Sequence, residues 1–478
     1  MTGKLNPRFS PRVDSGAMSS SLSRFVRMLM FALVLGLACA RPVAAAGEGP
    51  SILRDTETEA LFNDIAKPLV EAARLDNKSV KVVLLRDDEI NAFVAGSQNV
   101  YVNSGLLTAS DNVNQLQAVI AHELGHVAGG HAIRIGEGAK TATGISLATM
   151  VLGAIAIAAG APEAGMGLMA MGQQAAIGNF LSFTRAQETS ADLAGASYLA
   201  TAGISGKGSL EFFKKLQNQE YRLAIYATES YDRTHPLSSE RISILENLYK
   251  KDPAWERPSD PQLEARFQRV KAKLLGFING KQAINKYPER DQTVPAHYAR
   301  AYAYHLGAYP EKALAEAEAL LKTNPHDPYF LELKGQILLE SGRPAEAIAP
   351  LREATERSGR APLIASMLGH ALISTEDKKN LAEAKGILKT AVAVDNENPF
   401  AWYQLGMIYD QEGDTPRAAL ATAERNNLEG NPKLALASAE MAMRGIPAGT
   451  PDYLRAQDIA MVSKTELKKD KKGNRDRE

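Results

Sequence analysis

The sequence predicts a mostly helical α+β domain followed by an all-α solenoid of helical repeats. Two strand-like segments, near residues 80 and 100, lie among helical patterns, which is typical of an α+β domain. A helical segment that carries the pattern His-Glu-x-x-His comes next. Later in the chain, Gly335, Gly369 and Gly406 recur at intervals of 34 and 37 residues, which indicates repeated helical units.

Length and composition place the chain among ordinary folded proteins. Its 478 residues are enough for about three domains, so large buried cores can form. Apolar residues make up 45% and charged residues 23%, which excludes collagen-like and wholly disordered classes. Lysine plus arginine (55) balance aspartate plus glutamate (55), so the charge gives no reason to expect a nucleic-acid partner.

Residues 1–46 are typical of a cleaved secretory signal peptide. Basic residues precede an apolar run from Met28 to Ala40, and the small residues that signal peptidase accepts follow at positions 44–46. The run is too short to cross a hydrocarbon core of ~30 Å comfortably, although retention as an N-terminal anchor is the alternative. The single cysteine, Cys39, lies in this segment, so the cleaved chain can form no disulfide.

Residues 47–255 are expected to form the α+β domain. From Ile52 to about Leu75 the apolar residues have helical spacing. Val80 to Leu85 is a strand rich in β-branched residues, and Val100 to Val102 suggests a second strand after a Gly-Ser break. The rest of this domain is predicted to be mostly helical.

The segment from residue 144 to residue 178 is rich in alanine, glycine and methionine. Its first part, Gly144 to Ala161, is 18 residues long and nearly free of charge, which reaches the lower limit for a membrane span. Its many alanines and glycines weaken insertion, and Pro162-Glu163 end the run. We therefore expect a buried helical hairpin or a mobile apolar lid, with a membrane span or peripheral membrane association as the alternatives.

The C-terminal half is predicted to be helical throughout. Residues 256–290 are expected to form a linker and an amphipathic helix, and residues 291–460 to carry about four repeats and one further helical segment. The repeats resemble tetratricopeptide repeats, which stack around a shared core and leave a concave groove. A non-repetitive helical bundle is the alternative. The charged tail, residues 461–478, is expected to be disordered.

The pattern with the clearest chemistry is His122-Glu123-Leu124-Gly125-His126. On a helix, spacing i, i+4 places the two imidazoles on one face, where their neutral nitrogens suit Zn²⁺. Glu123 can then accept the proton of an attacking water. This is the arrangement of a zinc hydrolase, whereas two partly exposed histidines on a surface helix would be the structural alternative.

A catalytic zinc needs a third protein ligand. His131 lies nine residues after His122, which is the opposite face of an unbroken helix, so we exclude it. Glu188 is better placed because it precedes Asp192 by four residues on a second predicted helix. Glu188 can bind the metal while Asp192 supports a histidine ligand through a hydrogen bond.

Several short motifs together resemble one family, the gluzincin peptidases of the HtpX and CAAX prenyl protease type. They are His122 to His126, Glu188 with Asp192, Arg54-Asp55 with Glu57, Asn91-Ala92-Phe93, Gly105-Leu106-Leu107, and His235-Pro236 with Arg241. The resemblance covers residues 52–250 and implies a zincin-type metallopeptidase domain. It implies one zinc ion per chain, held by His122, His126 and Glu188, with Glu123 as the general base. It also implies that residues 98–104 form an edge strand that holds extended substrate.

His235 and Arg241 are further candidates for the catalytic site. His235 would lie over the zinc, where it would either stabilise the oxyanion or fill the open coordination position and keep the enzyme inactive. Arg241 would help as a charge or as a structural tie. A polar turn without catalytic function is the alternative for both.

Two functions from different classes follow from these features. The first is a periplasmic zinc endopeptidase whose repeats recruit clients or partners; the second is a periplasmic chaperone or scaffold that acts through the repeats, with proteolysis masked or vestigial. The resemblance, joined to the signal peptide and repeats, implies a role in quality control of outer-membrane proteins. Its substrates would be unfolded or misassembled outer-membrane proteins, and its partner the outer-membrane assembly machinery.

Overall fold

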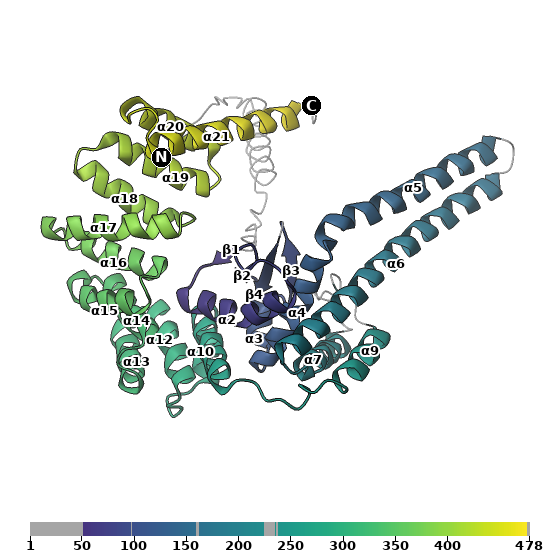
Figure 1. Cartoon of the computed structure of the whole chain (residues 1–478), viewed down its shortest axis with the longest axis horizontal. Coiled ribbons are helices and arrows are strands. Elements are labelled where there is room, and N and C mark those ends of the chain that lie inside the picture. The colour runs from purple at the N-terminus through teal and green to yellow at the C-terminus, as the bar shows by residue number, and fades with distance from the viewer. Residues whose placement is uncertain (1–50, 97, 159–161, 224–234, 236–237, 476–478) are drawn as a thin grey trace, which may run out of the picture. The chain divides into compact units, whose positions relative to one another are not determined.

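The computed structural model describes residues 51–96, 98–158, 162–223, 235 and 238–475 (Figure 1). The predicted signal peptide, its cysteine and the proline that follows His235 lie outside the described residues. The described chain is mostly helical, with a small sheet near its N-terminal end, so the predicted fold class is confirmed.

The sheet has four short strands in the order β1-β2-β4-β3, namely β1 (Ser51–Leu53), β2 (Lys81–Arg86), β3 (Ala92–Ala95) and β4 (Asn99–Asn103). Strand β4 pairs in parallel with β2 and antiparallel with β3. The prediction that residues 98–104 form an edge strand is therefore wrong, because β4 is central. The edge beside the candidate site is β3, whose four residues were too short a pattern to predict.

Helices cover this sheet and build the core of the first domain. They are α2 (Thr56–Ala72), α3 (Ser104–Ala109), α4 (Val113–Ala128), α5 (His131–Ala158), α6 (Pro162–Ala202), α7 (Lys207–Leu223) and α9 (Ser239–Tyr249). Asp55 caps α2 by accepting a hydrogen bond from the backbone N–H of Thr58. Asn112 caps α4 in the same way, and the buried residues of both helices share one core. The cap fixes the residue at which α4 begins. It thereby fixes where the histidines of α4 lie along the helix axis.

Helices α4 and α6 cross at unusually close range. A methyl group added to Gly125 on α4 would lie 2.6 Å from the backbone oxygen of Ala191 on α6. One added to Gly195 on α6 would lie 3.0 Å from the backbone oxygen of Ala121 on α4. Because only a hydrogen atom fits at each position, glycine allows the two backbones to touch.

Helices α5 and α6 form the helical hairpin that was predicted for residues 144–178, and Figure 1 shows them side by side. The expectation that this hairpin is buried is wrong, since the side chains of Met150 and Met171 are 54% and 71% exposed. Among the described residues, no helix combines the length and apolar character needed to traverse a bilayer.

Helix α10 (Pro261–Ile278) joins the first domain to the repeats. Phe267 and Val270 on α10 are fully buried in the core of the first domain, so the predicted amphipathic helix is an integral part of that core. On its other side α10 packs against α12, where an added methyl group on Gly276 would lie 2.3 Å from the backbone of Ala299. The two parts of the chain therefore share one packed helix.

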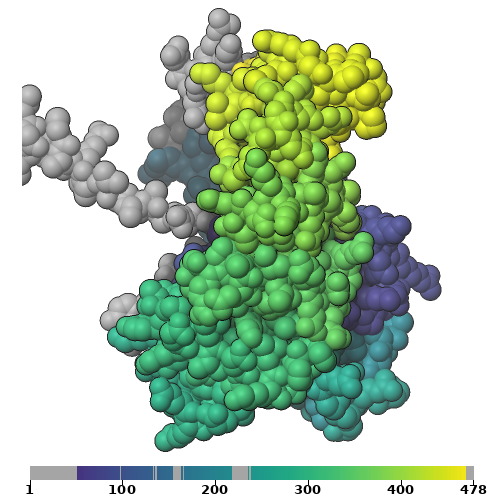
Figure 2. All heavy atoms as spheres, turned by 90° about the vertical axis from the view of Figure 1, so that its left-hand side faces the viewer, coloured from purple at the N-terminus to yellow at the C-terminus, as the bar shows by residue number. Residues whose placement is uncertain are grey.

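Paired helices follow in a regular series that forms a continuous surface (Figure 2). They are α11 (Gly280–Lys286), α12 (Val294–Leu306), α13 (Pro310–Thr323), α14 (Pro328–Glu340), α15 (Pro344–Arg357), α16 (Pro362–Ser374), α17 (Lys378–Val394), α18 (Pro399–Gln411), α19 (Thr415–Leu428), α20 (Pro432–Gly445) and α21 (Pro451–Arg475). Most begin with proline, which is favourable in the first turn of a helix. Helix α21 extends to residue 475, in contrast to the disordered tail we expected, because charged residues with good helix propensity continue the helix.

The close crossing of α4 and α6 predicts that Gly125→Ala destabilises the first domain by about 1–3 kcal/mol, since the added methyl group must push two backbones apart. Thermal unfolding measures this as a lower midpoint. The matched control is Gly178→Ala on α6, where an added methyl group meets no atom within 4 Å. That variant should be neutral or more stable, by up to about 1 kcal/mol. Equal effects of both substitutions would contradict the crossing.

Candidate metal centre

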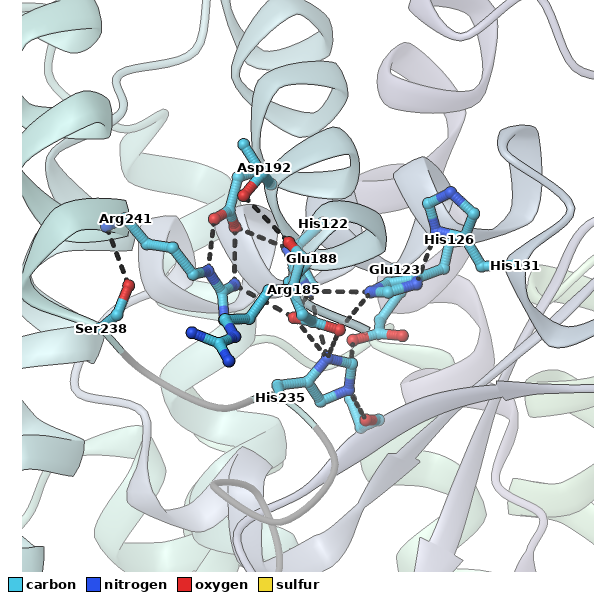
Figure 3. A network of polar contacts seen from close by, with 12 residues as sticks. His122, Glu123, His126, His131, Arg185, Glu188, Asp192, His235, Ser238 and Arg241 are labelled. Atoms are coloured by element: carbon cyan, nitrogen blue, oxygen red, sulfur yellow. Dashed lines mark hydrogen bonds and ion pairs between the residues drawn. The ribbon is translucent and has the colours of Figure 1, made fainter. Parts of the chain in front are cut away.

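Three segments far apart in the sequence place their polar side chains together (Figure 3). His122, Glu123 and His126 lie on α4, and Glu188 and Asp192 on α6. His235 comes from the segment before α9, and Arg241 from the first turn of α9. All seven of these predicted site residues are buried and lie in one cluster.

Four of these side chains direct a donor atom toward one point, namely His122, His126, Glu188 and His235. Nε2 of His122 lies 3.1 Å from Nε2 of His126 and 3.3 Å from Nδ1 of His235. The Glu188 carboxylate lies 3.5, 3.3 and 3.1 Å from these three nitrogens in the same order. A tetrahedral metal with ligands at ~2.0–2.1 Å has its ligand atoms about 3.3–3.4 Å apart. These five distances are close to that value, and one ligand atom from each of the four residues lies within 4.8 Å of the others, so the cluster can hold a metal ion.

The electrostatics of the cluster also favour a cation. Burial opposes charge on His122, yet contacts with Asp192 and Glu188 raise its pKa to about 10. Burial alone would raise the pKa of Glu188, but its contacts with His122, His126 and His235 lower it. The site thus holds a carboxylate charge deep in the protein and attracts positive charge, which a metal ion supplies better than a proton does.

Glu123 lies beside this group of donors without joining it. Both oxygens of its carboxylate are buried and make no hydrogen bond to the described residues. The Oε1 atom lies 3.5 Å from Nε2 of His235. Burying a carboxylate without hydrogen bonds costs free energy. The arrangement therefore indicates that Glu123 forms its hydrogen bonds with a group that binds in the site, such as a water molecule.

Arg241 holds the two acids of α6 in place. Its Nε donates to Oδ2 of Asp192 at 2.6 Å, and one terminal nitrogen donates to Oδ1 at 2.9 Å. The same guanidinium lies 3.1 Å from Glu188. Asp192 in turn lies 3.0 Å from Nδ1 of His122, a short contact that is not aligned as a hydrogen bond. Of the two predicted roles for Arg241, these contacts favour the structural tie.

His131 contacts the cluster, although the sequence placed it on the opposite face. Helix α4 ends at Ala128 with Gly129 as its cap, and Gly130 has a positive φ of 61°, so the chain turns before α5 begins. Nδ1 of His131 then lies 3.0 Å from Nδ1 of His126. A metal bound at Nε2 of His126 leaves the proton on Nδ1, which can donate to His131. His131 can therefore orient the ring of the candidate ligand His126. The sequence signal for the turn that brings them together was the Gly129-Gly130 pair.

Strand β3 borders the cluster and supplies one contact that the sequence did not reveal. Nε2 of His235 lies 3.3 Å from the backbone oxygen of Ala92. The neighbouring carbonyl, that of Asn91, accepts a hydrogen bond from the backbone N–H of Asn103, the last residue of β4. Because successive carbonyls of a strand point in opposite directions, the carbonyl of Ala92 faces away from β4, toward the edge that no described strand pairs with.

Comparison with known families decides what kind of domain this is. The model of peptidase family M48 matches residues 54–249, which include every side chain of the cluster. The chain carries a peptidase family M48 domain. The predicted family resemblance and the prediction of a metallopeptidase are thereby confirmed. A tetratricopeptide repeat model matches residues 299–362, which confirms the repeats that follow the M48 domain.

Curated relatives share both parts of the chain. The beta-barrel assembly-enhancing protease of Yersinia pestis is 26% identical over 409 residues, which span 82% of this chain and 81% of the relative. Its counterpart in Escherichia coli (strain K12) is 26% identical over 420 residues, or 86% and 83% of the two chains. Metalloprotease LoiP of the same strain is 30% identical over 175 residues, or 36% of this chain and 63% of the relative.

The contact between His131 and His126 predicts that His131→Ala weakens metal binding by about 10-fold or more, because His126 loses the partner that orients its ring. Competition with a chelator measures the affinity. His305→Ala is the matched control, since His305 pairs with Glu340 in the repeats. If both variants bind metal as tightly as the unmodified chain, His131 does not orient His126.

Proposed function

We propose that the chain is a zinc-dependent endopeptidase of the periplasm, which hydrolyses misfolded or stalled envelope proteins. The observation that carries the proposal is the convergence of the four donors, with the buried carboxylate of Glu123 beside them. The signal-like residues 1–46 support secretion. The names of the relatives support a role in the assembly of β-barrel proteins.

His122, His126 and Glu188 would hold one zinc ion per chain, supported by His131, Asp192 and Arg241. Two imidazoles and a carboxylate are a ligand set that zinc hydrolases use. When bound, zinc would act as a Lewis acid that polarises the scissile carbonyl. The Arg241 guanidinium pairs with both Asp192 and Glu188, so these two side chains are held in position and the ligand set would be preformed.

Glu123 is the residue that moves protons in this proposal. Its carboxylate would accept a proton from the attacking water and later deliver it to the amine of the leaving peptide. The free edge of β3 would hold the substrate in an extended form by main-chain hydrogen bonds. Main-chain pairing makes few demands on side chains, which suits an enzyme that acts on many unfolded clients.

His235 would keep the enzyme closed at rest. It is only 5% exposed, and its Nδ1 lies among the other donors. There it would occupy the fourth coordination position of the metal, which a substrate or water would need. This position supports the masking role over oxyanion stabilisation, because a histidine ligand in the fourth coordination position excludes substrate and water from the metal.

The alternative function is a chaperone or scaffold that acts through the repeats while proteolysis stays masked. The buried position of His235 is the observation that favours it. In both cases the repeats would recruit unfolded outer-membrane proteins or the machinery that assembles them. The exposed apolar side chains of the α5–α6 hairpin further support peripheral association with a membrane.

The ligand assignment predicts about one zinc per chain, measured by elemental analysis. His122→Ala and Glu188→Ala should lose zinc and activity together, because each removes a ligand. Glu123→Gln should keep zinc but slow the cleavage of unfolded casein by about 10²-fold or more, because the general base is gone. Full zinc content in Glu188→Ala would exclude Glu188 as a ligand.

The masking role predicts that His235→Ala raises basal cleavage of unfolded casein while leaving the zinc content unchanged. The control is His297→Ala, which removes a buried histidine that pairs with Glu316 in the repeats. If His235 instead stabilises the oxyanion, its removal should lower turnover by about 10²-fold. The two roles predict opposite signs, so one kinetic comparison separates them.

A further inference from the structure

A second cavity lies where the M48 domain meets the repeats. Its volume is about 410 Å³, and none of the residues that line it belongs to the metal centre. Arg54 and Asp55 line it from the start of the M48 domain, and most of the other lining residues come from α10, α14, α16 and α18. Most of its wall is apolar, formed by side chains such as Leu84, Leu274, Phe277, Leu339, Met367 and Phe400.

One carboxylate of this cavity lacks a partner in the described part of the chain. Glu332 on α14 is only 7% exposed, and its Oε2 atom makes no hydrogen bond to any described residue. Burial raises the pKa of Glu332 to about 8, although Lys273 opposes this shift. A buried polar atom without a partner is costly, so its presence in the wall of a cavity indicates a ligand that supplies the partner.

The other charged groups of the cavity already have partners. Lys273 donates to Asp55 and Glu57, so its charge is offset by two carboxylates. Arg54 pairs with Glu59 and Asp395. Glu340 accepts hydrogen bonds from His305 and Gln336. Glu332 is therefore the one carboxyl group of the cavity without a hydrogen-bond partner among the described residues, and its raised pKa leaves it largely protonated at neutral pH while the cavity is empty. A cation bound beside it would lower that pKa and leave the carboxylate ionised, whereas an anionic ligand would raise it further.

We propose that this cavity binds a basic side chain, lysine or arginine, of an extended polypeptide, with its charged end on Glu332. The apolar walls suit the hydrocarbon stem of such a side chain, and the ammonium or guanidinium group supplies the missing hydrogen-bond donor together with a positive charge that keeps Glu332 ionised. A purely apolar side chain would fill the same walls but would leave Glu332 buried without a partner. The cavity would thus select unfolded segments in which a basic residue is exposed.

The inference rests on the proposed role of the repeats in recruiting polypeptides, but not on the metal chemistry. Binding can therefore be measured in the full chain with Glu123→Gln, which cannot cleave the probe. Two fluorescein-labelled peptides, Gly-Ser-Gly-Lys-Gly-Ser-Gly and the same peptide with norleucine in place of lysine, share an apolar stem and differ in the charged end. Fluorescence anisotropy at physiological salt gives both affinities.

We expect the lysine peptide to bind about tenfold more tightly than the norleucine peptide, as a charge-assisted hydrogen bond requires. Adding Glu332→Gln should reduce this preference to about onefold. The matched control is Glu424→Gln, which alters a buried glutamate that pairs with Arg455 in a later repeat. That control should keep the tenfold preference, because it makes the same change of a buried glutamate to glutamine at another place.

Equal affinities for the two peptides, no binding of either peptide, or a lysine preference that survives Glu332→Gln would each overturn the inference. The proposed peptidase function fails by a different measurement, namely the absence of zinc or of Glu123-dependent cleavage in the unmodified chain. A chain that cleaves unfolded casein but shows no lysine preference would therefore reject this site alone.

Discussion

The backbone contact between α4 and α6 is the constraint on which the metal centre depends. The donors of His122 and His126 come from one helix and that of Glu188 from another, and they meet only because both helices approach closely at Gly125 and Gly195. A larger residue at either glycine would push the two helices, and with them the donors, apart. The chemistry of the site therefore depends on the packing of small residues at the crossing. Arg241 then holds Asp192 and Glu188 in place by ion pairs.

Much of this site could be predicted from the sequence because its parts have local signatures. His122, Glu123 and His126 share one helix, so their spacing alone predicts their common face. Glu188 and His235 lie far from that helix in the sequence, and only the family resemblance connected His235 with it. The turn at Gly130 placed His131 beside His126, which a continuous helix could not do.

The sheet and the α5–α6 hairpin show where sequence patterns were insufficient. Strand β3 has four residues, too few to display alternation, and β4 was taken for the edge because pairing partners are not encoded locally. The hairpin was correctly predicted as helical, but its apolar composition suggested burial. Composition shows that the side chains of the hairpin are apolar and favour apolar contacts. Whether other parts of the chain cover them depends on the fold, which composition does not give. The repeats were easier, because their glycine spacing repeats along the chain.

His235 joins the metal centre to the free edge of the sheet. Its Nδ1 lies among the metal donors, and its Nε2 lies against the carbonyl of Ala92, which a polypeptide pairing with β3 would also use. If substrate pairs with β3 as we propose, the incoming strand and the imidazole would compete for one hydrogen-bond acceptor. By thermodynamic linkage, the free energy that holds His235 on that carbonyl reduces the binding free energy of the strand. Strand binding in turn weakens the contact of His235 by the same free energy. A segment that pairs poorly would leave the site shut, whereas a long, flexible segment would open it by its own binding.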